Sequence, residues 1–228
     1  KKLLAVLITV IMIVTSVPFA FAADETPPTR TIDGKTYYEL DSADDLYWFA
    51  EQVNVNKNDT INAILTADIV INENLMSKIT VAEDGTATIN EGETVREWTP
   101  IKYFINSDMV GYKGIFDGSN HTISGLYGNS DDMHYMGFFA LANGATIKNL
   151  GIIDSYFYEY HNVASVVALA RNTTIINCFS ENCLIANESQ RAGGIAGMLY
   201  NSNIIGCYNA STIRESGGGY YIGGIVGE

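Results

Sequence analysis

Apolar residues recur with helical spacing in one segment near the start of the chain. They occupy positions i, i+3, i+4 and i+7, which lie on one face of a helix: Leu46, Phe49, Ala50 and Val53. Just before them, Ser42 is followed three residues later by Asp45, a capping-box arrangement that satisfies free backbone N–H groups. The pattern predicts a helix over residues 42–54 with one buried face.

Beyond this helix the apolar pattern changes to short β-rich runs. Residues 62–71 predict a strand, and two β segments around Asp84-Gly85 predict a hairpin over residues 79–89 that projects from the body of the fold. We assign these elements and the helix to an N-terminal cap region over residues 36–110. After it, strands and Gly/Asn turns continue without further helical periodicity.

The second half of the chain repeats with a period of about 28 residues, a length that suits one coil of a solenoid. Equivalent apolar segments begin at positions 137, 165, 194 and 224, which are nearly evenly spaced. A second marker runs in phase from positions 146, 174 and 203, and an earlier copy begins at position 122. Two markers with one period predict a parallel β-solenoid over residues 111–228, with one coil per repeat and coils paired at about 4.8 Å.

Stacked coils align equivalent side chains into columns. One predicted column is aliphatic and faces inward: Ile123, Ile147, Ile175 and Ile204. A second column contains Leu126, Leu150, Cys178 and Cys207, so cysteines replace leucines as small buried apolar residues.

The three cysteines do not form a disulfide framework. Cys178 and Cys207 would stack closely enough for a disulfide, but parallel side chains rarely present the required torsion. We therefore expect free thiols even in the oxidising setting of an exported protein. Cys183 falls on a different column and is no obvious partner for either.

The first 22 residues have the order of a secretory signal peptide. Lys1 and Lys2 precede an apolar run over residues 3–17, and a small-x-small pattern ends at Ala22, where we expect cleavage. The alternative is a retained membrane anchor, for which the run is short. Residues 23–35 predict a linker. The expected location is extracellular or cell-wall associated, with membrane contact only through the signal peptide.

Charge limits the classes of partner. Removing the signal peptide takes away two lysines and leaves 11 basic against 26 acidic residues, a net charge of −15. Nucleic acids and anionic membranes both require a basic surface, so neither is expected as a partner. The sequence predicts no cofactor; acidic loops would accept calcium, but no calcium-binding motif supports it.

Several motifs resemble the GLUG-motif repeats of bacterial surface proteins. They are Gly-Gly-Ile-Ala-Gly at 193–197, Gly-Gly-Ile-Val-Gly at 223–227 and the intervening Thr-Ile-x-Asn-Cys/Leu segments. The stretch 112–126 is similar to the first coil that precedes such repeats, and the helix segment 44–50 is similar to their N-terminal cap. The copies at 136–140 and 164–168 lack the double glycine, which leaves their corner geometry open.

The resemblance implies an all-β fold, a right-handed parallel β-helix (solenoid) with an N-terminal capping helix, on a secreted or wall-associated protein. It carries no catalytic residues. Such repeats occur in adhesin-like proteins and beside catalytic domains, including some IgA-specific metallopeptidases. Because no terminal cap follows the last repeat, we expect the repeats to be truncated at the C-terminus, with further domains downstream.

Catalytic chemistry has little support in the sequence. Glycoside hydrolysis needs two carboxyl groups about 5 to 9.5 Å apart. The predicted columns place Asp154 beside Asn182 and Glu181 beside Ile153, so no carboxylate pair forms. Residues 131–134 (Asp-Asp-Met-His) are the densest polar cluster, which we interpret as a solvated loop.

His121 and His161 are isolated in the sequence, with no recognisable Ser or Cys nucleophile. Tyrosines cluster at Tyr156, Tyr158 and Tyr160. If these rings are exposed, they would stack on sugars or proteins. The alternative is that tyrosine simply favours β-strands, which explains the same residues without a ligand.

Three functions remain in view. The leading hypothesis is a non-catalytic surface module of adhesion or structural type that contacts host or cell-wall glycan or protein. The second is a scaffold or N-terminal part of a larger secreted glycan-active enzyme or metallopeptidase. The third is a carbohydrate-binding module that uses the tyrosine cluster.

Overall fold

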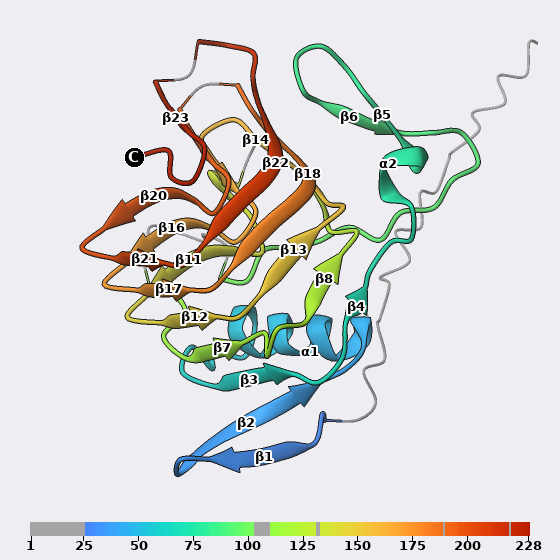
Figure 1. The fold of residues 1–228 in the computed structure, drawn as a ribbon. Helices are drawn as coiled ribbons and strands as arrows, with labels where there is room; N and C mark the ends of the chain where they lie inside the picture. Colours follow the sequence, from blue (N-terminus) through green and yellow to red (C-terminus); the bar gives the residue numbers. More distant parts are fainter. Residues whose placement is uncertain (1–25, 103–109, 131–132, 189, 219) are drawn as a thin grey trace, which may run out of the picture.

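The chain folds as a parallel β-solenoid of about six turns (Figure 1). This computed structural model describes residues 26–102, 110–130, 133–188, 190–218 and 220–228. The predicted all-β parallel β-helix, with a helix near its N-terminus and a hairpin insertion, is confirmed. The predicted signal peptide lies outside the described residues, and no helix within them is long and apolar enough to cross a membrane.

Each coil consists of short strands separated by tight corners. One complete coil comprises β12 (Thr146–Lys148), β13 (Gly151–Ile153), β14 (Tyr156–Glu159), β15 (Asn162–Ala164) and β16 (Val167–Arg171). The coil before it comprises β7 (Ile115–Asp117), β8 (Thr122–Ser124), β9 (Tyr127–Asn129), β10 (Tyr135–Met136) and β11 (Phe139–Asn143). The later coils comprise β17 (Thr174–Ile176), β18 (Phe179–Asn187), β19 (Arg191–Gly193), β20 (Ala196–Tyr200), β21 (Asn203–Ile205), β22 (Tyr208–Glu215) and β23 (Tyr221–Gly223).

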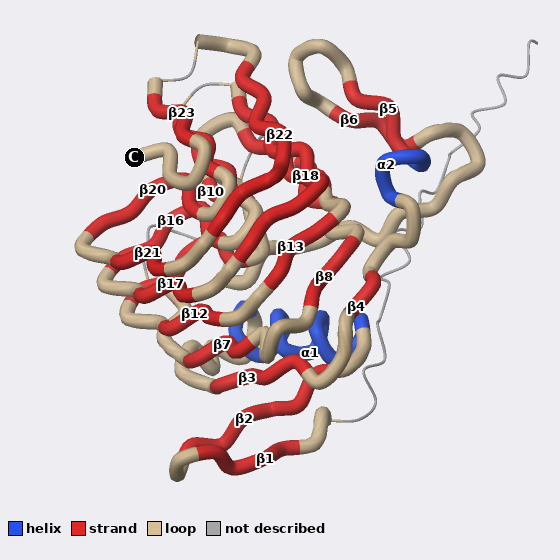
Figure 2. The backbone as a smooth tube through the Cα atoms, in the orientation of Figure 1, coloured by secondary structure: helices blue, strands red, loops and turns tan. Residues whose placement is uncertain are grey.

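Equivalent strands pair in parallel from coil to coil, which gives the layered stack in Figure 2. Phe139 pairs with Val167, Val167 with Ala196, and Ala196 with Val226. The offset between partners in each pair equals the corresponding repeat spacing that the sequence predicts. The register therefore confirms that one repeat forms one coil.

The predicted aliphatic column is correct except at its first member. Ile147, Ile175 and Ile204 stack in register, but Phe116 rather than Ile123 precedes them. Ile123 lies one face further along the coil and pairs with Ile152. The cause is visible in the spacing, because the copy at position 122 lies closer to the next copy than a full coil requires.

The second predicted column needs the same correction. Leu150, Cys178 and Cys207 are aligned, because the residues that follow them pair in register. Leu126 belongs to another column, since Tyr127 pairs with Tyr156 and the backbone N–H of Leu126 donates to Ser155 Oγ at 3.0 Å.

Left-handed backbone at the corners explains the recurring asparagines. Asn149 and Asn177 have φ of 53° and 51°, and Gly206 has 65° at the equivalent position. Asparagine tolerates this conformation better than most residues, and glycine adopts it freely. The turn after each of the equivalent strands β12, β17 and β21 therefore depends on one asparagine or glycine in the left-handed conformation.

The helix α1 (Ala43–Asn54) lies at the first end of the solenoid (Figure 1). Ser42 Oγ accepts the backbone N–H of Asp45, as the capping box predicts. Phe49 on its buried face contacts Tyr112 and Phe116, with ring centroids 5.9 and 5.6 Å apart. The helix therefore covers apolar side chains of the first coil that would otherwise face water.

The strands around this helix differ in part from prediction. The expected strand over residues 62–71 is divided into β3 (Asn62–Leu65) and β4 (Ile69–Val70), because a corner separates two faces of an early coil. The predicted linker over residues 23–35 is wrong at β1 (Thr29–Ile32), which pairs antiparallel with β2 (Lys35–Leu40).

The predicted hairpin is present and folds back onto the solenoid. It comprises β5 (Ile79–Val81) and β6 (Ala87–Ile89), preceded by the short helix α2 (Leu75–Lys78). We call α2, β5 and β6 the arm. Its buried residues pack with solenoid residues in a second apolar cluster: Leu75, Ile79, Ala87, Tyr127, Tyr156, Tyr158, Leu184 and Ala186.

Candidate functional site

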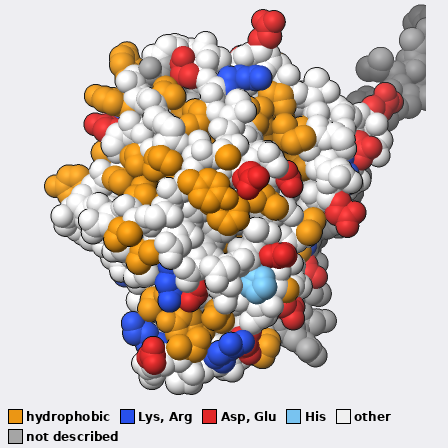
Figure 3. Space-filling model, in the orientation of Figure 1, with side chains coloured by type: hydrophobic (Ala, Val, Ile, Leu, Met, Phe, Trp, Pro, Cys, Tyr) orange, Lys and Arg blue, Asp and Glu red, His pale blue; other side chains and the backbone are white. Residues whose placement is uncertain are grey.

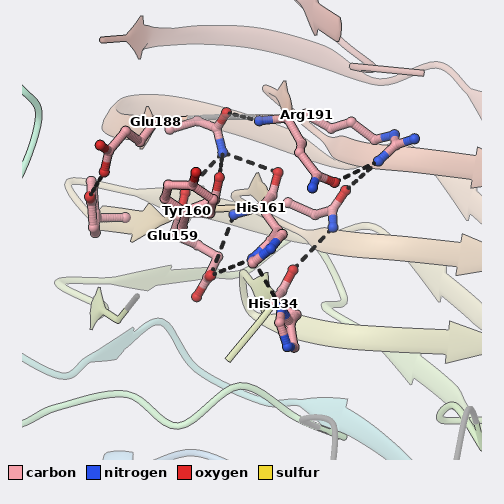
Figure 4. A network of polar contacts seen from close by, with 10 residues as sticks. His134, Glu159, Tyr160, His161, Glu188 and Arg191 are labelled. Atoms are coloured by element: carbon pink, nitrogen blue, oxygen red, sulfur yellow. Dashed lines mark hydrogen bonds and ion pairs between the residues drawn. The ribbon is translucent and has the colours of Figure 1, made fainter. Parts of the chain in front are cut away.

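A cluster of titratable side chains lies where β14 turns into β15. Glu159 ends β14, His161 occupies the turn, and His134 lies just before β10 in the preceding coil. Because Tyr135 pairs with Asn162, the two histidines are stacked one coil apart. Their Nδ1 atoms are 3.0 Å apart, so one ring donates a hydrogen bond to the other (Figure 4).

Glu159 is fully buried, and its carboxylate has an incomplete set of partners. Oε1 accepts the backbone N–H of His161 at 3.4 Å and lies 3.6 Å from His161 Nδ1, whereas Oε2 has no hydrogen-bond partner among the described residues. Burial raises the pKa of Glu159 to about 7, although nearby backbone N–H groups oppose the shift. Burial also lowers the pKa of His161. The cluster can therefore hold and release a proton near neutral pH.

The turn that carries this cluster is tied to the next coil. Asn187 Nδ2 donates to the main-chain oxygens of Glu159, Tyr160 and His161 at 2.9, 3.3 and 3.2 Å (Figure 4). Asn187 Oδ1 accepts the backbone N–H of Gln190 at 3.0 Å. One asparagine thus holds two successive turns together.

This arrangement favours proton storage over catalysis. A general acid must come within hydrogen-bond reach of the substrate. Glu159 has no exposed surface, and only the two histidines of the cluster reach solvent. In this conformation a substrate cannot touch the Glu159 carboxyl group, whose pKa suits acid–base chemistry at neutral pH.

The three tyrosines of the predicted ligand site are not brought together on one open surface. Tyr156 is fully buried beneath the arm, and its hydroxyl donates to the main-chain oxygen of Gly85 at 2.6 Å. Tyr158 is 5% exposed and donates to Glu188 Oε2 at 2.9 Å. Tyr160 is 40% exposed. The first two rings are therefore not the exposed rings that the prediction assumed, because the arm covers them.

Two other predictions about candidate chemistry can be compared with the structure. Glu181 aligns with Ile153 and Ala210, so that column holds a single carboxylate, as expected. The sequence suggested that His161 is isolated. This prediction is wrong, because the neighbouring coil brings His134 against it. Asp131 and Asp132 lie outside the described residues. Within those that are described, no group of three or more His, Cys, Asp or Glu side chains is placed to hold a metal ion.

The cysteines are free thiols, and two of them are stacked as predicted. Cys207 Sγ accepts the backbone N–H of Cys178 at 3.3 Å, and Cys183 lies on another column. Hydrogen bonding from the Cys178 side chain lowers the pKa of Cys207 to about 7, although burial opposes this shift. The half-buried Cys207 is thus the more reactive of the pair.

Polar side chains at the corners bond mainly to polar side chains at the same corner of the neighbouring coil. Asn177 Nδ2 donates to Asn149 Oδ1 at 3.3 Å, and Asn149 Nδ2 donates to Asp117 Oδ1 at 3.0 Å. A second ladder runs from Asn201 to Asn172 at 2.6 Å, and from Asn172 to Asn143 at 3.2 Å. These groups stabilise stacking instead of facing a ligand.

Comparison with known proteins finds a similar structure but no similar sequence. No model of a known protein family matches it, and no curated protein sequence matches it. The structure is similar to the crystal structure of a "putative immunoglobulin A1 protease" from Bacteroides ovatus, with a TM-score of 0.51 and 16% sequence identity. The match covers 86% of this chain and 72% of that one. At this identity the likeness concerns the fold alone, and the chain shares the β-solenoid architecture of that protein.

Proposed function

We propose that the chain is a β-solenoid module of GLUG-repeat type that is exported to the cell surface or beyond it. It acts as a rigid scaffold that contacts host or cell-wall glycan or protein, and it performs no catalysis of its own. The predicted signal peptide supports export. The strongly acidic composition argues against nucleic acid as a partner.

The observation that carries the proposal is that polar side chains form hydrogen bonds between neighbouring coils and so hold the stack of coils together. The asparagine ladders at two corners and the Asn187 bonds all join one coil to the next. The buried Ile147, Ile175 and Leu150 do the same within the core. A module built this way resists bending and shearing between coils, which suits a scaffold.

A second candidate is a scaffold within a larger secreted peptidase or glycan-active enzyme. The likeness to a protein described as an immunoglobulin A1 protease favours it. In that case this chain positions a catalytic part and contributes no reacting group. Both candidate functions place the chain outside the cell. They differ in whether the complete protein also contains a catalytic part that hydrolyses a peptide or a glycan.

Surface shaving tests the proposal. Intact cells that produce the complete protein are treated with an external protease, and the module is followed with an antibody. We expect loss of the module without release of a cytoplasmic marker; protection of the module until the cells are lysed would contradict the proposal.

Hydrolysis is tested separately with the purified chain. We expect no cleavage of immunoglobulin A1 or of soluble glycans by the chain itself. Cleavage that disappears in Glu159→Gln would overturn the non-catalytic assignment.

A further inference from the structure

Two aromatic rings form a ledge on the outer face made by β13, β18 and β22. Phe179 begins β18 and pairs in register with Tyr208, which begins β22. Their ring centroids are 5.1 Å apart and the ring planes differ by 3°. Tyr208 is 49% exposed. On this face hydrophobic side chains gather near the middle, with acidic side chains beside them (Figure 3).

The backbone beneath the ledge fixes the position of the rings. Gly151 occupies the equivalent position in the preceding coil. A methyl group at Gly151 would overlap the Phe179 ring, so this ring lies directly over the glycine backbone. Tyr208 repeats the same orientation one coil later. Both rings are held by the coil register, which lowers the entropy lost when a ligand binds.

A carboxylate lies beside the rings on the same face. Glu181 follows Phe179 by two residues, so both side chains point outward from β18. Its Oε2 is 3.5 Å from the Tyr208 hydroxyl, at the limit of a hydrogen bond. Glu181 is flanked in its column by Ile153 and Ala210, which offer no competing side-chain donor. Its carboxylate can therefore accept hydrogen bonds from a ligand.

We propose that Phe179, Tyr208 and Glu181 form a binding subsite for a neutral pyranose unit of a glycan. The apolar face of the sugar ring packs on the aromatic ledge, and its hydroxyl groups donate to the Glu181 carboxylate. The proposal rests on the surface role given above and names the ligand class for it.

Charge and size favour this ligand over others. The chain carries a net charge of −13, which repels sulfated and other anionic glycans. A protein partner generally requires a larger contiguous surface than two rings with an acidic edge. One sugar unit needs no more than an aromatic ring and a hydrogen-bond acceptor beside it.

The test is binding of the complete chain to soluble neutral glycans: mannan, β-glucan, galactan and N-acetylglucosamine oligosaccharides. Affinity electrophoresis identifies the ligand, and calorimetry gives the association constant. We expect Tyr208→Ala to weaken binding about tenfold or more, and Tyr208→Phe to stay within about twofold because it keeps the ring. Glu181→Gln weakens binding less than Tyr208→Ala.

Matched variants separate the ledge from general surface effects. Tyr200→Ala removes an exposed ring on β20, a different face, and should leave binding unchanged. Gly151→Ala displaces the Phe179 ring, on which the Tyr208 ring stacks, and should weaken binding although Tyr208 itself is kept. Circular dichroism establishes that each variant is folded.

Three results would overturn the subsite: no binding to any of these glycans, equal binding by wild type and Tyr208→Ala, or binding only to anionic glycans or to a deglycosylated protein. Surface shaving is independent of these measurements. A module that is on the surface but binds no neutral glycan refutes the ledge alone, whereas a module that is never exported refutes the proposed function.

Discussion

The Glu159 carboxyl group is fully buried, so replacing Glu159 with glutamine changes how the stability of the fold depends on pH. Burial raises the pKa of this carboxyl group from 4.5 to about 7. Between these two values the folded state keeps a proton that the unfolded state releases. Stability from this group is therefore complete below pH 4.5 and is lost as the pH rises through 7.

The magnitude follows from the size of the shift. One pKa unit corresponds to about 1.4 kcal/mol, so the wild-type chain loses about 3 kcal/mol of unfolding free energy through Glu159 by pH 8. Glutamine is neutral throughout and does not show this loss. His161, whose pKa is lowered, weakens the fold in the opposite direction, as the pH falls. Because His161 is present in both proteins, its effect largely cancels in their difference.

Urea unfolding at pH 4.5, 6, 7 and 8 measures this difference. Unfolding is followed by far-ultraviolet circular dichroism and by the fluorescence of Trp48 and Trp98, which are buried in the fold. We expect the stability of Glu159→Gln relative to wild type to rise by about 3 kcal/mol across this range. The control is Glu51→Gln, at an exposed position on α1, which removes the same charge.

A relative stability that stays constant within about 0.5 kcal/mol would refute the reasoning, since it would mean that the Glu159 carboxylate is hydrated in the folded protein. A rise of equal size in Glu51→Gln would instead assign the effect to net charge.

Four further substitutions or modifications test separate parts of the structure. Ile175→Ala leaves a cavity in the aliphatic column and should cost about 2–5 kcal/mol in urea unfolding. Gly125→Ala should cost at least about 1–3 kcal/mol, because Gly125 has a φ of 71° and a methyl group would meet the Asn72 backbone. Tyr156→Phe removes the hydroxyl bond to the arm; amide exchange in β5 and β6 should accelerate with about 1 kcal/mol of local stability lost. At pH 7.5 a maleimide should modify Cys207 before the buried Cys178, as read by mass spectrometry of proteolytic peptides.

Local signals in the sequence are sufficient for the helix and the hairpin. Ser42, Asp45 and the apolar stripe of α1 all lie within one short segment, and Asp84-Gly85 marks the turn of the arm. Such elements depend on neighbours in the chain, so their residues identify them directly.

The register of the coils was predictable where the period held and failed where it did not. The stack of Ile147, Ile175 and Ile204 follows from their regular spacing of one repeat. Ile123 departs from the predicted column because the first coil is irregular, and a similar motif there begins a different face. Sequence similarity between segments thus indicated the wrong column once the spacing departed from a full coil.

The candidate site depends on contacts that only the folded chain defines. The tyrosine pattern of β14 correctly indicated a strand, but nothing in it showed that the arm would cover Tyr156 and Tyr158. The pairing of His134 with His161 has a signal in the sequence, since their separation along the chain is close to one period. The burial of Glu159 had no such signal, because it results from the meeting of three coils.

The scaffold role depends most directly on parallel stacking of one repeat on the next. Backbone nuclear Overhauser contacts in the isotopically labelled chain measure this stacking. The account predicts parallel-strand contacts that link Thr146 to Thr174 and Thr174 to Asn203, and that continue along each pair of strands. Antiparallel contacts between neighbouring strands within one repeat, without contacts between equivalent positions of successive repeats, would contradict it.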